Sequence, residues 1–254
     1  MQAPIDSQMK LTFAQPVAKW VRAYFNGQLL VDTKKAILLG RDRRPPVYFI
    51  PKQDVKMAYL TPANDEGAPD DDETNSRWNI VVGKRYVANA AMEYKGSVLS
   101  VSLDNYLTFD WSAMDSWFEE QEQVYVHPRD PYVRVDTLHS SRHVKVIIHG
   151  ETVAETHNPV LLFETGLPVR YYIPKIDVRL DLLIDSDHVT HCPYKGEAHY
   201  YSVRIGNYTM EDVAWYYPYP VAESMKIASY VAFYEERVDV IEVDGERSSQ
   251  FGGD

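Results

Sequence analysis

Cysteine is nearly absent from the chain, since Cys192 is the only one among 254 residues. A single cysteine excludes an intrachain disulfide and a zinc site made of cysteine pairs. Long apolar runs are also absent, because none approaches the roughly 20 residues that a membrane-spanning helix needs. The start MQAPIDSQMKLTF has no basic segment followed by an apolar one. We therefore expect no signal peptide, no membrane association and a cytoplasmic location.

Positive charge is scarce. The chain has 26 Lys and Arg residues against 37 Asp and Glu residues, which gives a net charge of −11 at pH 7. A nucleic-acid-binding surface needs basic residues to displace counterions, and the basic run GRDRR at residues 40–44 is short and isolated. No Walker or G-x-G-x-x-G loop is present either. We therefore expect no nucleic-acid partner.

Tyrosine and proline are abundant, with 19 and 15 residues against 12 glycines. This composition favours β-structure with many turns. The hydrophobic share of 45% supplies enough apolar material for one or two cores. The length of the chain suits one large domain or two of ordinary size.

An internal repeat decides between these two arrangements. Residues 21–60 align without a gap onto residues 144–183 at a constant offset, which places Gly27 on Gly150 (150 − 27 = 123), and about a third of the positions are identical. The ends of the two copies, DSWFEEQEQVYVHPRDPYVRVD and ESMKIASYVAFYEERVDVIEVD, align at a smaller offset, whereas the middles do not align convincingly. Two homologous domains follow, because the period is too long for a solenoid.

We predict a mainly β chain of two compact, antiparallel domains with short helices. VKVIIHGETVAET reads as two strands around a His-Gly turn, VLLFETG and VRYYIP as short strands, and ASYVAFYEE with VDVIEVDGE as a closing strand pair. Short helices are expected near KIDVRLDLL and AESMKI. The predicted boundaries are an extension at 1–18, a first repeat at 19–137 with an acidic, disordered insertion at 61–77, a second repeat at 138–247, and a tail at 248–254.

Five motifs in the second repeat resemble one protein family. They are YYIPKIDVRLDLL, THCPYKGEAHYYSV, AWYYPYP, YVAFY and VDVIEVDGE, and in this order they resemble domain of unknown function 427, some members of which carry a nucleotidyltransferase label. The resemblance implies a β-tent fold, similar to that of methionine sulfoxide reductase B. It implies no activity. Thr156, Tyr216 and Ser229 depart from residues common in the family.

The resemblance covers the second repeat throughout and the first repeat only in its first third and its last strands. The first repeat has no cysteine, and its YKG at residues 94–96 does not align cleanly with Tyr194–Gly196. We therefore predict an intact C-terminal copy and a degenerate N-terminal copy that acts as a structural partner. A built-in pair of domains is compatible with a monomer or a homodimer.

The segment THCPYKGEAHYY suggests a site around Cys192 and Lys195. Cys192 is a candidate nucleophile or redox thiol, Lys195 a charge that holds an anionic group, and Glu164 a general base or orienting group. The alternative is that Cys192 is a small buried core residue. His191, Cys192 and His199 could instead bind a metal, but neighbours on a strand point to opposite faces, so we predict no metal site and no cofactor.

An aromatic pocket without turnover is the other hypothesis for this region. Aromatic pockets with a few polar groups are typical of small-molecule sites, although large side chains also fill small β-cores. We thus predict a pocket that binds or modifies a small molecule, the alternative being a ligand-sensing or protein–protein interaction module. The candidate ligand-binding residues are Arg142, Tyr172, Lys175, Tyr194, His199, Tyr201 and Trp215.

Overall fold

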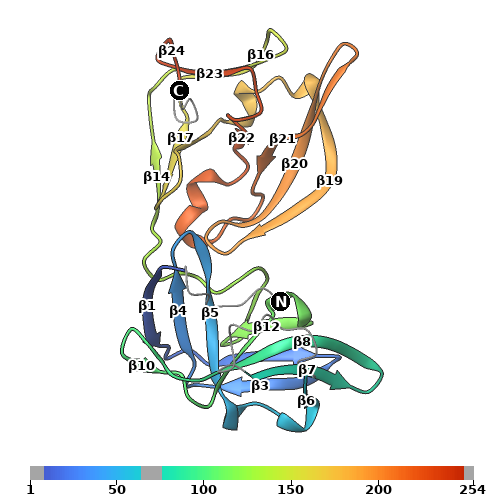
Figure 1. Ribbon diagram of the computed structural model, residues 1–254. Coiled ribbons are helices and arrows are strands. Elements are labelled where there is room, and N and C mark those ends of the chain that lie inside the picture. Colours follow the sequence, from blue (N-terminus) through green and yellow to red (C-terminus); the bar gives the residue numbers. More distant parts are fainter. Residues whose placement is uncertain (1–8, 64–75, 249–254) are drawn as a thin grey trace. The chain divides into compact units, whose positions relative to one another are not determined.

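The computed structural model of the chain describes residues 9–63 and 76–248 (Figure 1). Its contacts divide the chain into two compact units, 1–130 (unit one) and 131–254 (unit two). Residues 64–75, most of the acidic insertion predicted to be disordered, lie outside the described residues, whereas residues 61–62 and 76–77 of that insertion belong to strands. Among the described residues, no helix has the length and apolar character to cross a membrane.

Unit one contains a long sheet and a smaller one. The long sheet has the order β1 (Leu11–Pro16), β4 (Ile37–Arg41), β5 (Arg44–Pro51), β11 (Tyr106–Phe109), β8 (Arg85–Tyr94), β7 (Ser76–Val82) and β6 (Leu60–Pro62). The smaller sheet has the order β13 (Glu122–Val124), β12 (Ser116–Glu119), β2 (Val21–Phe25) and β3 (Gln28–Thr33). The remaining elements are the hairpin β9 (Ser97–Val98) and β10 (Val101–Ser102), and the 3₁₀ helices η1 (Lys52–Asp54), η2 (Met57–Tyr59) and η3 (Trp111–Ala113).

Unit two repeats this plan. A three-stranded sheet has the order β14 (Val135–His139), β17 (Val160–Glu164) and β18 (Arg170–Tyr172), and a four-stranded sheet the order β19 (Leu183–Cys192), β20 (Gly196–Ile205), β21 (Tyr208–Tyr216) and β22 (Val231–Phe233). A bridge between Ile173 and Val231 joins the two sheets where β5 pairs with β11 in unit one. The remaining elements are β16 (Glu151–Thr156), β15 (Val144–Ile148), β23 (Val240–Val243) and β24 (Glu246–Arg247), which form the smaller sheet, and η4 (Lys175–Asp177), η5 (Leu180–Leu182) and η6 (Ala222–Ile227).

The predicted mainly β fold in two antiparallel halves with short helices is confirmed. All pairs between the strands named above are antiparallel, and 3₁₀ helices occur where the sequence predicted short helices, at η4, η5 and η6. The finer assignment to the β-tent fold stays a prediction.

The two units share their strand registers through the middle of the repeat. In unit one Trp78 pairs with Ala91, and in unit two Tyr201 pairs with Ala214, so both partners are displaced by 123 (201 − 78 = 214 − 91 = 123). A register shift follows that pair in both hairpins. The prediction that the middles do not align is therefore wrong, because strand pairing is repeated where side-chain identity is not.

The last strand of unit two that pairs with its first hairpin is displaced by 124 residues from its counterpart in unit one. Trp117 of β12 pairs with Ala23 of β2, and Ile241 of β23 pairs with the matching residue of β15, Val146 (241 − 117 = 124). The predicted alignment of the ends used an offset of 108 (223 − 115) and is wrong. The two alignments differ by 16 residues (124 − 108), an even number, so the period-two pattern of a strand fits both of them.

The predicted closing strand pair is also wrong. β22 pairs with β21, whereas β23 pairs with β15 and β24, so the two runs belong to different sheets. Alternation of apolar and polar residues identifies a strand but does not identify its partner.

The stretch of chain between β6 and β7 in unit one has the same length as the stretch between the matching positions of β19 and β20 in unit two. Pro62 lies at the end of β6 and Ser76 at the start of β7, and the matching positions in unit two are 185 and 199 (76 − 62 = 199 − 185 = 14). In unit two this interval contains Cys192 and Lys195, and in unit one it contains the acidic run. The repeat therefore diverges at the segment that carries the candidate site.

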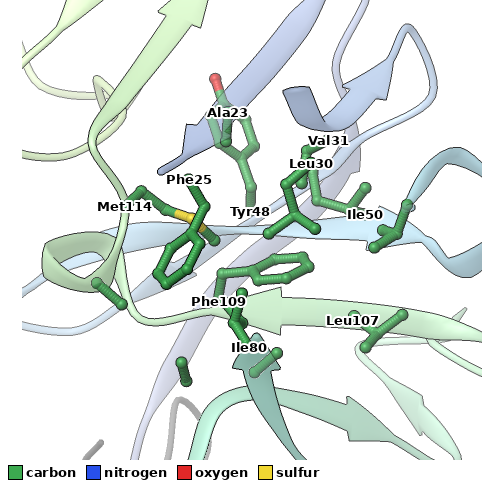
Figure 2. Close-up of a cluster of buried hydrophobic side chains, with 14 of the residues drawn as sticks. Ala23, Phe25, Leu30, Val31, Tyr48, Ile50, Ile80, Leu107, Phe109 and Met114 are labelled. Carbon is green, nitrogen blue, oxygen red and sulfur yellow. The ribbon is translucent and has the colours of Figure 1, made fainter. Parts of the chain in front are cut away.

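Each unit has its own hydrophobic core. In unit one, side chains from β2, β3, β5, β7 and β11 meet between the sheets with no exposed surface (Figure 2), among them Phe25, Leu30, Ile50, Ile80 and Leu107. Unit two has one cluster around Val146, Val203 and Ile241, and a second around Tyr172 and Trp215. The second cluster is the one that underlies the candidate site.

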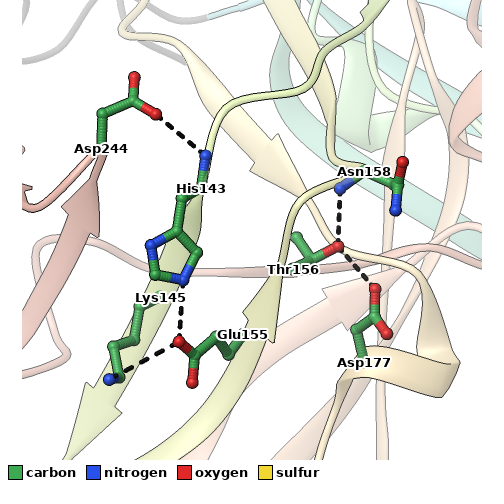
Figure 3. A network of polar contacts seen from close by, with 7 residues as sticks. All are labelled: His143, Lys145, Glu155, Thr156, Asn158, Asp177 and Asp244. Atoms are coloured by element: carbon green, nitrogen blue, oxygen red, sulfur yellow. Dashed lines mark hydrogen bonds and ion pairs between the residues drawn. The ribbon is translucent and has the colours of Figure 1, made fainter.

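A buried threonine ties the smaller sheet to the following 3₁₀ helix in both units. Thr156 donates a hydrogen bond to Asp177 Oδ2 at 2.6 Å and accepts one from the Asn158 N–H at 3.0 Å (Figure 3). Thr33 makes the same pair of bonds with Asp54 at 2.7 Å and with the backbone N–H of residue 35 at 3.0 Å. This pair of hydrogen bonds recurs in both units and is therefore evidence for the repeat that does not depend on strand pairing.

Candidate functional site

Unit two has a partly open pocket of about 160 Å³ between β17, β18 and the sheet formed by β19–β22. Strand alternation directs the aromatic side chains of β20 and β21 that line it to one face of that sheet. The lining residues are Leu162, Glu164, Leu167, Pro168, Arg170, Tyr172, Lys195, Tyr200, Trp215, Tyr217 and Tyr234.

An ion pair forms one wall of the pocket. Lys195 Nζ, from the turn between β19 and β20, contacts Glu164 Oε2 at the end of β17. The side chains are 14% and 8% exposed respectively, so both charges are largely removed from water. A buried ion pair pays a desolvation penalty that is seldom recovered in full, so it is weak evidence for a role in stability.

Aromatic rings form much of the rest of the wall. Trp215 Nε1 donates to the Tyr172 hydroxyl at 3.2 Å, and the Trp215 ring lies 4.4 Å from that of Tyr234, centroid to centroid. The Arg170 guanidinium lies over the Trp215 ring, 5.6 Å from its centroid. Arg170 also donates two hydrogen bonds to Glu236, at 2.8 and 3.0 Å. Each cation that lines the pocket is thus matched by a carboxylate.

The hydroxyls of Tyr172 and Tyr217 are held protonated. Burial raises the pKa of Tyr172. The hydrogen bond from Trp215 opposes this rise in part, and the nearby Cys192 and Glu164 add smaller increases. Burial likewise raises the pKa of Tyr217, followed by the neighbouring charges of Tyr172 and Cys192. These hydroxyls therefore act as neutral hydrogen-bonding groups at physiological pH.

Cys192 lies next to the pocket rather than in its wall. It is the last residue of β19, it is half-buried, and it is a free thiol. Of the described residues, it is not among those that line the pocket, although it is close enough to Tyr172 and Tyr217 to raise the pKa of both. Cys192 thus influences the site only through the pKa of these two tyrosines.

The family model of domain of unknown function 427 (DUF427) matches the chain twice, at residues 13–120 and 136–244. The chain belongs to the DUF427 family. No curated protein matches the chain. The match in unit one runs through the whole repeat, which corrects the prediction that only its first third and last strands resemble the family.

Unit one nevertheless has Arg41 at the position of Glu164 (164 − 41 = 123).

Several predicted ligand-binding residues of the second DUF427 unit lie in a separate cluster. Lys175 Nζ donates to the Tyr201 hydroxyl at 3.0 Å and lies 4.1 Å from the centroid of the Tyr216 ring. Tyr201 stacks on Tyr216 at 4.9 Å, and the His199 ring lies 5.7 Å from the same Tyr216 ring. His199 and Tyr201 lie in β20 on either side of the pocket residue Tyr200 and therefore point to the opposite face of the sheet. None of these four side chains lines the pocket with Tyr172 and Trp215.

The remaining predicted residues do not line the pocket either. Arg142 is exposed and lies 3.9 Å from Asp244, next to the smaller sheet. The Tyr194 backbone carbonyl accepts a hydrogen bond from Ser224 Oγ at 3.0 Å, which holds the turn that carries Lys195. Tyr194 thus contributes to the shape of the turn.

The histidines near Cys192 pair with one carboxylate. His191 and His199 lie 3.0 and 2.9 Å from the two carboxylate oxygens of Glu197. Among the described residues, no group of three or more His, Cys, Asp or Glu side chains could hold a metal ion.

Of the polar and aromatic residues that line the pocket, four were not among the predicted site residues: Arg170, Tyr200, Tyr217 and Tyr234. Tyr200 bonds to Thr190 Oγ1 at 2.9 Å, and its hydroxyl lies 3.4 Å from that of Tyr234. Arg170 of β18 pairs with Leu162 of β17, which lies two residues before Glu164. Pairing of the two predicted short strands VLLFETG and VRYYIP would have placed Arg170 near Glu164.

Proposed function

We propose that the second DUF427 unit binds a small, neutral, single-ring molecule that has a hydrogen-bonding group. The observation that carries the proposal is the buried Lys195–Glu164 pair in the wall of an aromatic pocket. Such a pair offers one strong donor and one strong acceptor within reach of the same ligand group.

The size of the pocket limits the ligand. A cavity of about 150 Å³ holds one benzene ring, and the pocket measures about 160 Å³. The rings of Trp215 and Tyr172 meet edge to face at 6.3 Å, an arrangement that leaves flat surface for a further ring. Larger metabolites such as nucleotides exceed this volume.

The charge balance argues for a neutral ligand. Lys195 is paired with Glu164, and Arg170 is paired with Glu236. An anion bound to Lys195 would lie beside the carboxylate of Glu164, and a cation bound to Glu164 would lie beside the ammonium group of Lys195, so an ion of either sign would be repelled. A carboxamide or a phenol can instead accept from Lys195 and donate to Glu164 without leaving a buried charge unpaired.

The fold itself does not require the ion pair. Arg41 occupies the position of Glu164 in unit one, and the strands around it keep the same register. A costly buried pair in one copy of a repeated fold is therefore better explained by ligand recognition than by stability. The cytoplasmic location and the absence of a nucleic-acid partner remain predictions.

Benzamide is the direct probe of this site. We expect it to bind the full chain, with benzylamine and benzoate binding about tenfold more weakly at unit two, because each of them brings a charge into a balanced pocket. The double variant Lys195→Met/Glu164→Leu should remain folded, because hydrophobic replacement of a buried pair is often neutral. It should lose at least about tenfold in benzamide affinity, measured by calorimetry.

Lys175→Met is the matched control, since Lys175 is a hydrogen-bonded lysine of the same unit outside the pocket. It should leave benzamide affinity unchanged. Equal weakening by this variant and by the double variant would argue against the site.

Thiol chemistry is the second candidate function, favoured by the closeness of Cys192 to two pocket tyrosines. If the pocket only binds, Cys192→Ser keeps the affinity for benzamide. A loss of affinity in Cys192→Ser, or alkylation of Cys192 that benzamide blocks, would favour the thiol as a working group.

A further inference from the structure

Two buried tyrosine hydroxyls in the pocket of unit two have spare hydrogen-bonding capacity. Tyr172 is 1% exposed and Tyr217 is 4% exposed, and both line the pocket. The Tyr172 hydroxyl accepts a bond from Trp215 Nε1 at 3.2 Å, and no described group accepts its proton. In the described part of the chain, no hydrogen bond joins the Tyr217 hydroxyl to another group. A buried donor without an acceptor is costly, so both hydroxyls are available to a ligand oxygen.

Unit one shows that the fold does not need the Tyr172 hydroxyl. Phe49 pairs with Ile37 as Tyr172 pairs with Val160 (172 − 49 = 160 − 37 = 123). Phe49 has no exposed surface, so the same core position is filled by a ring without a hydroxyl. A buried hydroxyl that keeps a spare proton in one copy of the repeat is therefore better explained by recognition of an oxygen atom than by packing.

Both hydroxyls can donate to the same kind of atom. Burial raises the pKa of Tyr172 and of Tyr217, so each keeps its proton at physiological pH. The charge of Tyr172 also raises the pKa of Tyr217, which places the two groups near each other. A carbonyl oxygen has two lone pairs and can accept two such bonds. Donors of this kind stabilise negative charge that develops on the oxygen when the carbonyl carbon is attacked.

Lys195 supplies an amine in the wall of the same pocket. Its backbone carbonyl accepts a hydrogen bond from the Val221 N–H at 3.1 Å, which fixes the turn, and its Nζ contacts Glu164. A lysine amine in an apolar pocket is a typical partner for a carbonyl group. Entry of a ring displaces water and makes both charges more costly, and transfer of one proton from Lys195 to Glu164 removes both of them.

We propose that Lys195 forms a reversible imine with an aromatic aldehyde, whose carbonyl oxygen is bound by the hydroxyls of Tyr172 and Tyr217. The proposal rests on ligand binding by unit two and names the class of ligand. An aromatic aldehyde is a small, neutral, single-ring molecule with a hydrogen-bonding oxygen, so it meets the requirements of the pocket.

The reaction needs no further reagent. Glu164 takes a proton from the Lys195 ammonium group, and the lone pair of the amine attacks the carbonyl carbon. The electrons of the C=O bond move to the oxygen, which receives a proton from the attacking nitrogen to give a carbinolamine. Glu164 then protonates the departing hydroxyl group, water leaves, and the nitrogen lone pair completes the C=N bond. The product is a protonated imine, so the wall again has one cation beside one carboxylate.

The test uses the full chain with benzaldehyde and sodium cyanoborohydride, which reduces the imine to a stable benzylated lysine. Peptide mapping by mass spectrometry should show Lys195 labelled at least about tenfold faster than Lys52. Lys52 is the matched internal control, because its Nζ lies 2.7 Å from Glu93 Oε2 and 4.9 Å from the Trp78 ring centroid but it does not line the pocket. Benzamide should slow labelling of Lys195 and leave Lys52 unchanged.

Tyr172→Phe tests the role of the hydroxyls. It should fold, because Phe49 fills the matching position in unit one, and it should slow labelling of Lys195 about tenfold, because one donor to the oxygen is lost. Tyr219→Phe, at a position that is 90% exposed, should leave the labelling rate unchanged. Equal slowing by these two variants would overturn the role of Tyr172.

The outcomes separate this proposal from the one on which it rests. Equal labelling of Lys195 and Lys52, or labelling of Lys195 that benzamide does not slow, would overturn imine formation in the pocket. Benzamide binding without labelling of Lys195 would overturn it as well and leave ligand binding by unit two standing. Failure of benzamide to bind the full chain would overturn the proposed function itself.

Discussion

Three buried tyrosines couple the stability of the chain to alkaline pH. Burial raises the pKa of Tyr48, Tyr172 and Tyr217 well above the ordinary value, with further increases from Glu119 for the first and from neighbouring ionisable groups for the others. The pKa of tyrosine in an unfolded chain is about 10. Below that pH both states hold the protons, and above it only the unfolded state releases them.

We therefore predict that the free energy of unfolding falls as pH rises above about 10, because the native state then binds more protons than the unfolded state. Each buried tyrosine should contribute up to about 1.4 kcal/mol per pH unit. Urea unfolding between pH 9 and 11 measures the slope. Tyr217→Phe should make it shallower, and Tyr219→Phe, at a position that is 90% exposed, should not. An unchanged slope in Tyr217→Phe would contradict this account.

At the scale of the element, the turn between β19 and β20 depends on a glycine. Gly196 has a φ of +108°, and a Cβ there would lie 3.2 Å from the Tyr219 carbonyl oxygen and 3.4 Å from Pro220 Cα. Gly96 has a φ of +111° with nothing within 4 Å of the same position. The two glycines thus share one backbone conformation but differ in their surroundings.

We predict that Gly196→Ala lowers the melting temperature more than Gly96→Ala. Alanine is strained by the backbone conformation at both positions, but only at position 196 would its Cβ also approach other backbone atoms. Since Lys195 precedes Gly196, the same change should weaken benzamide binding, and Gly96→Ala should not. Thermal melts and calorimetry on the two variants check this. Similar effects of both variants would show that the close approach of residues 219–220 does not matter.

The elements also show what the sequence could reveal. The repeat at residues 21–60 was predictable because prolines, glycines and alternating apolar residues recur at a fixed spacing. The register of β7 with β8 was not, because matching positions have unlike side chains, such as Trp78 against Tyr201 and Glu93 against Tyr216. Pairing is specified by both strands together, so a single strand's pattern cannot reveal it.

The candidate site was predictable in part for the same reason. Lys195, Glu164, Tyr172 and Trp215 do come together around one pocket. Lys175, His199 and Tyr201 were grouped with them because all lie in aromatic motifs, but they form a separate cluster. A reading by motif includes both faces of a strand, whereas a pocket uses one of them.

At the scale of the whole molecule, each unit contains complete cores. The clusters around Val146 and around Tyr172 are made only of residues of unit two, and those of unit one only of residues of unit one. We therefore predict that residues 131–254 fold alone with a single cooperative transition. Urea unfolding of the fragment, followed by fluorescence and circular dichroism, tests this. A fragment without dispersed amide NMR signals would contradict it.

The stretches that join matching strand positions in the two units have equal length, so each unit can serve as the experimental control for the other. Residues 63–75 and 186–198 fill intervals of identical length between matching strand positions, so either stretch could be transplanted into the other half with the flanking ladders unchanged. The duplication thus supplies a scaffold on which one variable segment can be exchanged, and any recognition property that travels with the graft belongs to the segment rather than to its host.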